Sequence, residues 1–413
     1  MKKLVYLIIF FLYSTVMNAQ LKDLVQYVNT LQGTDSNFGL SYGNTYPTTG
    51  MPYGMHMWSA QTGKNGDGFK YMYAVDKIRA FSQSHQCSPW VSDYAVYSFM
   101  PMVGELVVNQ DARATKFSHD NEIAKPHYYK VTFDNGITTE MAPTTRGVHL
   151  RFSYPTTGDA YLVLDGYTDM SEIKIDPAKR QISGWVNNQR FVNDSKSFRN
   201  YFVVQFDKPF EDYGVWENQK DEVFPQKLDG AGKGYGAFIK FKKGSKVQAK
   251  AASSYISAEQ ALITLNKELG KDKNLEVTKA RGQKTWNEVL NRIVVEGCTD
   301  EQMKTFYSCL FRANLFSRKF YERKENGEPY YYSPYNGKIY DGYMYTDNGF
   351  WDTFRSQFPL TNILHPTMQG RYMNALLAAQ EQCGWLPSWS SPGETGGMLG
   401  NHSISLLADA WAK

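Results

Sequence analysis

Cysteine is scarce in this sequence, which holds only four among its 413 residues. Cys87, Cys298, Cys309 and Cys383 form no CxxC pair, and none has a histidine at zinc-binding spacing. On one helix, Cys298 and Cys309 would lie about 16 Å apart along the axis, too far for a disulfide. We therefore expect neither a zinc site nor a disulfide framework. Mostly free, buried thiols are the prediction, with a Cys87–Cys383 bridge as the alternative.

Charge of one sign is also scarce. The 45 basic and 41 acidic residues leave a net charge of only +4, and no basic block stands out. Proteins that bind nucleic acid usually concentrate Lys and Arg in a patch or stripe. The sequence therefore predicts no nucleic-acid partner, and it indicates nothing about the oligomeric state.

Long hydrophobic runs are missing after the N-terminus, where no stretch approaches the ~18 uninterrupted apolar residues of a membrane-spanning helix. Residues 1–19 carry two lysines, a short apolar run from Leu4 to Leu12 and a small residue at Ala19, the pattern of a secretory signal peptide. We expect cleavage after Ala19 and an exported protein, periplasmic or secreted, without a membrane span. A retained N-terminal anchor is the alternative.

Short strand-like stretches are plentiful between about residues 95 and 265. Period-two alternation occurs in 128–133, 148–154, 161–164, 201–206 and 238–241. Asp134-Asn135-Gly136 is a strong hairpin signal, and the glycine-rich residues 230–236 are expected to form a second hairpin rather than a phosphate-binding loop. The pattern predicts a β-sandwich domain over residues 20–265.

Helical patterns dominate afterwards. The charged residues 266–290 are expected to form a linker or helical connection. Thr299 and Gln302 can make a capping box, Pro366 and Gly384 suit the start and stop of another helix, and a third helix begins near Asn401. The expected fold class is multi-domain β + α, with a helical domain over residues 291–413 packed on the sandwich.

One carboxylate near the C-terminal end lies among tryptophans and glycines. Glu394 follows Trp385 and Trp389, and Gly393 and Gly396 flank it. Indole faces pack on pyranose rings, glycine lets a ligand approach the backbone, and burial against an indole would keep a carboxyl group protonated. Glu394 is therefore the candidate general acid of a glycosidase, an enzyme class that normally needs a second carboxylate. A glutamate held by a helix dipole is the alternative.

A second candidate segment combines acid, aromatic and base in residues 345–355. Asp352 could accept hydrogen bonds from two sugar hydroxyls, and Trp351 could stack beneath the sugar. Arg355 completes the group, and an ordinary Asp352–Arg355 ion pair on a helix face is the alternative interpretation.

Two loop-rich segments near the N-terminus, residues 43–55 and 79–94, have the composition of ligand-facing loops. His85 and Asp93 are the candidate substrate or metal ligands there, with a purely structural hydrogen-bonding role for the histidine as the alternative. A serine nucleophile is set aside because no Gly-x-Ser-x-Gly elbow occurs.

Several of these segments together resemble glycoside hydrolase family 92, the exo-acting α-mannosidases. The resemblance rests on Gly43-Asn44-Thr45-Tyr46-Pro47, Phe81-Ser82-Gln83-Ser84-His85, Trp351-Asp352-Thr353-Phe354-Arg355, Gly384-Trp385-Leu386-Pro387 and Gly393-Glu394-Thr395-Gly396. These motifs occur in the family's order through the whole mature chain.

The resemblance implies a β-sandwich followed by an (α/α)6-barrel domain, and Ca²⁺-dependent hydrolysis of terminal α-mannose from glycans with inversion. By motif position it implies Glu394 as general acid and Asp352 as a mannose-binding carboxylate with Trp351 beside it. Trp90 would shape the leaving-group side.

The chain departs from the family pattern at two points. Thr48-Thr49 replaces smaller residues, and a later segment resembling Gly-Asn-Asp-Asp-x-Gly-Gln, the source of the catalytic base and of calcium ligands, does not occur. We therefore expect a C-terminally truncated, incomplete barrel and assign neither a base nor a metal ligand. The alternative function is a secreted, catalytically inactive carbohydrate-binding relative.

Overall fold

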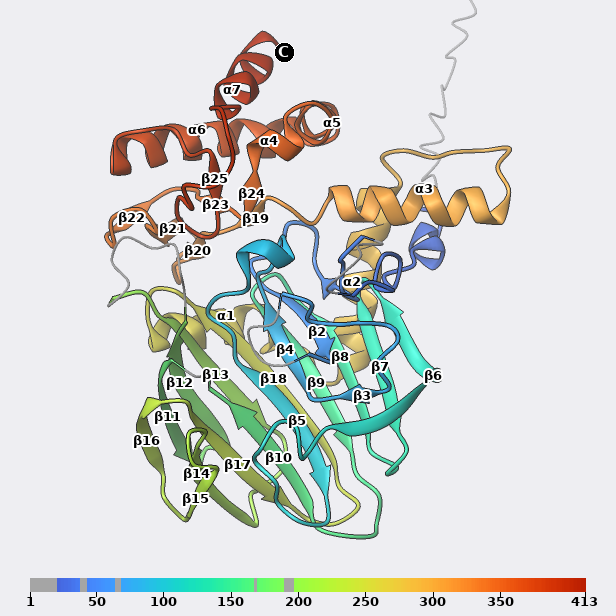
Figure 1. The fold of residues 1–413 in the computed structure, drawn as a ribbon, viewed down its shortest axis with the longest axis vertical. Helices are drawn as coiled ribbons and strands as arrows, with labels where there is room; N and C mark the ends of the chain where they lie inside the picture. The colour runs from blue at the N-terminus through green and yellow to red at the C-terminus, as the bar shows by residue number, and fades with distance from the viewer. Residues whose placement is uncertain (1–20, 38–42, 64–67, 167–168, 189–196) are drawn as a thin grey trace, which may run out of the picture.

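The computed structural model describes residues 21–37, 43–63, 68–166, 169–188 and 197–413, so the predicted signal peptide lies outside the described residues. Two large β-sheets form one end of the molecule, and the later helices lie across the other end (Figure 1). Among the described residues, no helix combines the length and apolar character that crossing a bilayer requires.

The first sheet has eight strands in the order β1-β2-β4-β5-β10-β17-β14-β15. Every pairing within it is antiparallel. Its strands are β1 (Thr49–Gly50), β2 (Met57–Gln61), β4 (Ala80–Ser84), β5 (Ser98–Val103), β10 (Ala160–Asp165), β14 (Asp212–Glu217), β15 (Glu222–Pro225) and β17 (Tyr235–Phe241).

The second sheet has ten strands in the order β16-β11-β12-β13-β18-β9-β8-β7-β6-β3, also antiparallel. Its strands are β3 (Lys77–Ile78), β6 (Thr115–Lys125), β7 (Tyr128–Phe133), β8 (Thr138–Pro143), β9 (Gly147–Ser153), β11 (Met170–Asp176), β12 (Gln181–Asn187), β13 (Asn200–Phe206), β16 (Asp229–Lys233) and β18 (Lys246–Ser254).

The core of the sandwich is built from the inward-facing residues of both sheets. In β12, buried and half-buried side chains alternate along the whole strand, which is the period-two pattern of a sheet with one face on the core. Leu150 and Phe152 of the second sheet join the same buried cluster as Leu162 and Leu164 of the first. The predicted strands are therefore confirmed, with β7 matching residues 128–133.

The two predicted hairpins have different outcomes. Asp134-Asn135-Gly136 joins β7 to β8, and Gly136 has a φ of 86°, which a residue without a Cβ adopts readily. The prediction for residues 230–236 is wrong, because β16 pairs with β11 of the ten-stranded sheet whereas β17 belongs to the eight-stranded sheet. Most of the glycine-rich stretch is thus strand β16 itself, and Gly234 connects it to β17 in the other sheet.

The helices begin within the predicted sandwich range and cover one face of it. Helix α1 (Ala258–Leu269) packs on β18 and β13, and α2 (Leu275–Leu290) packs on β8 and β9, so residues 266–290 cover the ten-stranded sheet. The remaining helices are η1 (Leu24–Tyr27), η2 (Pro89–Val91), α3 (Asp300–Ala313), α4 (Phe350–Thr353), α5 (Gln357–Leu364), α6 (Pro366–Cys383) and α7 (Ser403–Ala412).

Local signals set the helix ends as predicted. Thr299 and Gln302 form a reciprocal capping box at the start of α3. Helix α6 begins at Pro366 and ends before Gly384, which has a φ of 92°. A large β-sheet region followed by a helical region is thus confirmed, while the (α/α)6 arrangement stays a prediction.

Short strand pairs connect the helices and position the loops between them. They are β19 (Arg318–Lys319) with β23 (Tyr345–Thr346), β20 (Glu322–Arg323) with β21 (Pro329–Tyr332) and β22 (Ile339–Asp341), and β24 (Asn348–Gly349) with β25 (Trp389–Ser390). The last pair sets Gly349 opposite Trp389. It therefore brings the Asp352 segment beside the Glu394 loop.

Candidate functional site

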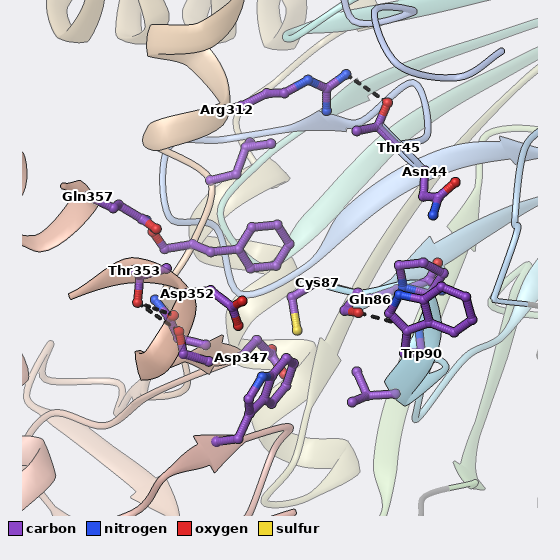
Figure 2. A pocket seen from close by; sticks show the side chains of 18 of the residues that line it. Asn44, Thr45, Gln86, Cys87, Trp90, Arg312, Asp347, Asp352, Thr353 and Gln357 are labelled. Atoms are coloured by element: carbon purple, nitrogen blue, oxygen red, sulfur yellow. Dashed lines mark hydrogen bonds between the residues drawn. The ribbon is translucent and has the colours of Figure 1, made fainter. Parts of the chain in front are cut away.

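A cavity of about 660 Å³ lies between the end of the sandwich and the helical region (Figure 2). Residues from the sandwich side lie within 43–48 and 86–91, and residues from the helical side lie within 312–316, 347–357 and 389–398. Pockets between domains are common ligand sites, and the wall here mixes aromatic rings with amide, hydroxyl and carboxylate groups. The geometry therefore marks this cavity as the candidate site.

Asp352 lies on the short helix α4 and lines the cavity. Within the described residues, no hydrogen bond or ion pair engages its carboxylate, so the alternative Asp352–Arg355 ion pair does not form there. Figure 2 shows the carboxylate directed into the cavity. Gly349 makes this placement possible, because a Cβ at that position would collide with the Asp352 carboxylate and the Trp389 indole.

A second carboxylate, Asp347, also lines the cavity but is fully engaged. Its Oδ2 accepts hydrogen bonds from Arg318 and, at 2.9 Å, from the Tyr94 hydroxyl, and its Oδ1 accepts one from Ser391 Oγ at 3.0 Å. Asp347 is buried and has a φ of 63°, a conformation costly for a residue other than glycine. Arg318 also donates to the carbonyl of Met55, so this buried pair ties the helical region to the sandwich.

Trp90 stands on the rim of the cavity in helix η2 with 74% of its surface exposed. Ser88 Oγ accepts a hydrogen bond from the Trp90 backbone N–H at 3.3 Å, and the Phe69 ring meets the indole edge-on at 6.4 Å between centroids. An indole fixed at its base and open on its face suits stacking on a sugar ring.

The loop that carries Trp90 is organised by Asp93 behind the cavity wall. The Asp93 carboxylate accepts hydrogen bonds from Ser84 Oγ at 2.9 Å and from the backbone N–H groups of His85 at 2.9 Å and Tyr94 at 2.8 Å. It also pairs with Lys70 Nζ at 2.9 Å, and both side chains are excluded from solvent. A buried ion pair with this many additional donors holds one loop conformation.

His85 is fully buried and is not among the residues that line the cavity. Its Nδ1 lies 2.6 Å from the Tyr94 carbonyl oxygen, and its Nε2 lies 2.8 Å from His56 Nδ1 and 3.1 Å from the Tyr255 hydroxyl. Burial and then the positive charge of Arg318 lower the pKa of His85, so the ring is neutral. The geometry is that of the structural hydrogen-bonding alternative.

Trp351 and Arg355 lie beside the cavity rather than in its wall. Trp351 is 41% exposed, and the Arg355 guanidinium carbon sits 5.5 Å from the centre of its ring. Neither residue is among those that line the cavity, although their neighbours Asp352 and Thr353 are. The cation–π stack of Arg355 on Trp351 therefore lies at the outer edge of the site.

The Glu394 carboxylate is half-buried and faces its own loop. Its Oε1 accepts hydrogen bonds from Ser388 Oγ at 2.8 Å and the Gly396 N–H at 2.9 Å. Its Oε2 accepts from the N–H groups of Ser388 at 2.8 Å and Trp389 at 3.4 Å. Its neighbours Trp389, Thr395 and Gly397 line the cavity, but Glu394 itself does not.

Sequence reasoning missed several residues that line the cavity, among them Arg312, Asp347, Gln357 and Cys87. Cys87 is a free thiol, as are the other three cysteines, so the predicted free thiols are confirmed and the Cys87–Cys383 bridge is absent. The predicted burial is wrong for Cys298 and Cys309, which are exposed. Burial raises the pKa of the Cys87 thiol to about 12, which excludes a thiolate nucleophile near neutral pH.

A calcium site would need several oxygen ligands close together. The described residues contain no group of three or more His, Cys, Asp or Glu side chains able to hold a metal ion. Of the two carboxylates in the cavity wall, Asp347 is already saturated with donors, whereas Ca²⁺ takes six to eight oxygen ligands. These residues alone do not fit a calcium ion.

A sandwich capped by a helical region, with aromatic rings and an unengaged carboxylate in the cavity between them, is typical of proteins that bind a small polar ligand between two domains. Comparison with known families narrows this class. Residues 27–254 match the glycosyl hydrolase family 92 N-terminal domain, and residues 260–413 match the glycosyl hydrolase family 92 catalytic domain. The chain belongs to glycosyl hydrolase family 92, which confirms the resemblance in the sequence.

Solved structures of family 92 proteins are similar to this chain. The family GH92 inverting mannosidase BT2199 from Bacteroides thetaiotaomicron VPI-5482 is 45% identical, with a TM-score of 0.91 over 94% of this chain and 52% of that one. The family GH92 α-mannosidase BT3965 from Bacteroides thetaiotaomicron, at 24% identity and a TM-score of 0.81 over 94% of this chain and 54% of that one, shares the fold.

A curated relative, an uncharacterized secreted glycosidase of Arthroderma benhamiae, is 22% identical over 357 residues, which are 76% of this chain and 44% of the relative. The chain thus spans about half the length of the proteins it matches.

Proposed function

We propose that this protein is an α-mannosidase that removes terminal α-linked mannose from glycans with inversion of configuration. Membership of family 92 and 45% identity to a structure described as an inverting mannosidase support the activity. The single observation that carries the site is the unengaged Asp352 carboxylate, directed into a cavity between the two domains. Export is proposed with it, supported by the signal-like N-terminus and by the secreted relative.

The cavity suits a terminal sugar for physical reasons. A free carboxylate accepts hydrogen bonds from two adjacent hydroxyls, and a mannose ring presents such pairs. Trp389 is buried in the wall and Trp90 is exposed on the rim, so one indole can pack on the bound ring and the other on the group that leaves. Because one indole would contact the terminal sugar and the other would contact the group that leaves, the cavity favours cleavage of one sugar from the end of a chain.

Asp352→Asn tests the site. The amide keeps the shape of the side chain but replaces one charged acceptor by a donor, so we expect kcat/KM toward α-mannosides to fall by about 10²-fold or more. The free energy of unfolding should change little, because Asp352 has no partner in the described part of the chain. Unchanged affinity for a mannoside, measured by titration calorimetry, would remove Asp352 from the site.

The general-acid role of Glu394 stays a prediction that competes with a structural role. Four hydrogen bonds from its own loop engage both oxygens of the Glu394 carboxylate, whereas a proton donor must present an oxygen to the group that leaves. Those contacts favour Glu394 as the residue that fixes the loop beside Trp389.

Glu394→Gln separates the two roles of Glu394 through the choice of leaving group. Loss of an acid should lower kcat by roughly 10²- to 10⁴-fold for a sugar leaving group and much less for an activated aryl mannoside. Loss of a loop anchor should lower kcat/KM for both substrates by a similar factor. Glu381→Gln, the same change at an exposed position of α6, is the control.

Family membership favours the enzyme over the carbohydrate-binding alternative. The two differ in turnover: the alternative predicts mannoside binding without release of mannose. Calcium dependence stays a proposal, and dialysis against a chelator followed by restoration with CaCl₂ tests it. Mannose release that is unaffected by the chelator would contradict the dependence.

A further inference from the structure

The Asp352 carboxylate takes its direction from the backbone that carries it. Within the described part of the chain, no hydrogen bond or ion pair engages this carboxylate. It leans over Gly349 and fills the space that a Cβ at this glycine would need. Because the carboxylate has no partners of its own, whatever fixes residues 348–353 also sets where it points.

A side-chain hydrogen bond closes this turn across its base. Thr353 Oγ1 lies 2.8 Å from Asn348 Oδ1 and 2.8 Å from the Gly349 carbonyl oxygen, so the hydroxyl shares its hydrogen between these two acceptors. Figure 2 shows Thr353 with its hydrogen bonds on one side of the turn and the Asp352 carboxylate directed into the cavity on the other. The closed turn therefore contains both Asp352 and the glycine beneath its carboxylate.

Asn348 is anchored in turn by groups behind the cavity wall. Its Nδ2 donates to Ser317 Oγ at 2.9 Å, and Ser317 Oγ donates to the Tyr372 hydroxyl of α6 at 2.9 Å. All three residues are buried, and neither Ser317 nor Tyr372 lines the cavity. In a buried chain of this kind, removing one member leaves its neighbour without a partner, so the chain holds one arrangement. It connects helix α6 to the turn that carries Asp352.

We propose that Asn348 and Thr353 are positioning residues, which hold the Asp352 carboxylate toward the cavity by locking the turn around it. The inference rests on the proposed function, in which Asp352 binds hydroxyl groups of a mannoside. Both residues line the cavity, but their polar groups are engaged with each other and with the buried chain. A misplacement of about 1 Å in a group that contacts the substrate can lower the rate by as much as about 10²-fold.

Thr353→Val tests the positioning role, because valine keeps the branched shape and removes only the hydroxyl. We expect kcat/KM toward an aryl α-mannoside to fall roughly 10-fold, and Thr353→Ser, which keeps the hydroxyl, should recover most of that loss. Thr285→Val is the matched control, since the Thr285 hydroxyl donates at 3.0 Å to the carbonyl of Arg281, four residues back on α2 and outside the cavity wall. This control should leave kcat/KM unchanged.

A double-mutant cycle separates positioning from a merely structural role. In the Asp352→Ala background no carboxylate remains to be positioned, so Thr353→Val should lower kcat/KM by less than about twofold there. An equal loss in both backgrounds would mean that Thr353 acts through general stability, and it would overturn the inference.

A crystal structure of Thr353→Val tests the geometry independently of the reaction. The Asp352 carboxylate should turn away from the cavity, and an unchanged direction overturns the positioning role alone. A wild-type chain that neither binds nor cleaves α-mannosides would overturn the proposed function, and the crystal structure would still decide whether Thr353 sets the direction of the carboxylate.

Discussion

Gly349 shows how a single residue can decide whether the site exists. Strand β24 sets it opposite Trp389, and any side chain there would meet both the indole and the Asp352 carboxylate. The Trp389 indole cannot move aside because it is buried, so the Asp352 carboxylate would have to shift. The position therefore requires the absence of a Cβ for packing reasons, independently of backbone conformation.

We expect Gly349→Ala to lower mannoside affinity by roughly 10-fold or more by displacing Asp352, with a stability loss of about 1–3 kcal/mol from overpacking. Calorimetric titration with a mannoside and a urea unfolding curve measure the two effects. Gly370→Ala, on α6 where a Cβ meets nothing within 4 Å, is the matched control. Full affinity in Gly349→Ala would show that Asp352 does not depend on this packing.

The residues of the site differ in how far the sequence could predict them. Asp352 stands among aromatic residues in one short segment, so local composition was sufficient to single it out. Arg312 looked like an ordinary helix residue, because its partners Thr30 and Gln32 lie about 280 positions earlier in the chain. Contacts of that separation leave no local pattern.

At the scale of the element, the loop between β4 and β5 depends on the buried Lys70–Asp93 pair. Removing Lys70 leaves Asp93 without its opposite charge in a site closed to solvent. Breaking a buried pair in this way typically costs about 3–5 kcal/mol. The loss would fall on the segment that carries Gln86, Cys87 and Trp90 into the cavity wall.

Lys70→Met is therefore expected to lower the free energy of unfolding by about 3–5 kcal/mol and to weaken mannoside binding, as measured by urea unfolding and calorimetry. Lys77→Met, an exposed lysine on β3, should change neither quantity by more than about 0.5 kcal/mol. A change below about 1 kcal/mol for Lys70→Met would mean that Asp93 is held well enough by its three other donors.

Elements themselves were predictable where their signals are local. The capping box of α3, the proline and glycine at the ends of α6, and the hairpin at residues 134–136 depend on a few neighbouring residues. The path of residues 230–236 depends instead on which distant strand β16 pairs with. Alternation within a strand does not contain that information.

On the scale of the whole molecule, buried polar groups join the helical region to the sandwich. Glu322 of β20 accepts a hydrogen bond from the Tyr255 backbone N–H at 2.8 Å, and its other oxygen is buried without a partner among the described residues. Burial raises the pKa of Glu322 from 4.5 to about 7, although Ser254, Tyr255 and Arg146 oppose the shift. The junction is therefore sensitive to pH.

The direction of this pH effect follows from proton binding. Between about pH 4.5 and 7, the unfolded chain releases a proton that folded Glu322 retains, so the free energy of unfolding falls as the pH rises. Glu322→Gln removes the titrating carboxyl group. Between pH 5 and pH 8, the free energy of unfolding of the wild type should therefore fall by up to about 2–3 kcal/mol relative to that of the variant. Urea unfolding of both proteins at the two pH values measures this fall. An equal difference at both pH values would place the Glu322 pKa near its ordinary value.

The unpaired sulfur atoms have a practical consequence for handling and labelling the protein. Cys298 and Cys309 are exposed, whereas burial leaves the thiol of Cys87 almost wholly protonated at neutral pH. Maleimide dyes and dissolved oxygen should therefore attack the two outer sulfurs first. Replacing those two with serine would leave two half-buried thiols and a preparation that resists cross-linking on storage. Replacing Cys383 as well would leave Cys87 as a slow-reacting reporter of cavity occupancy.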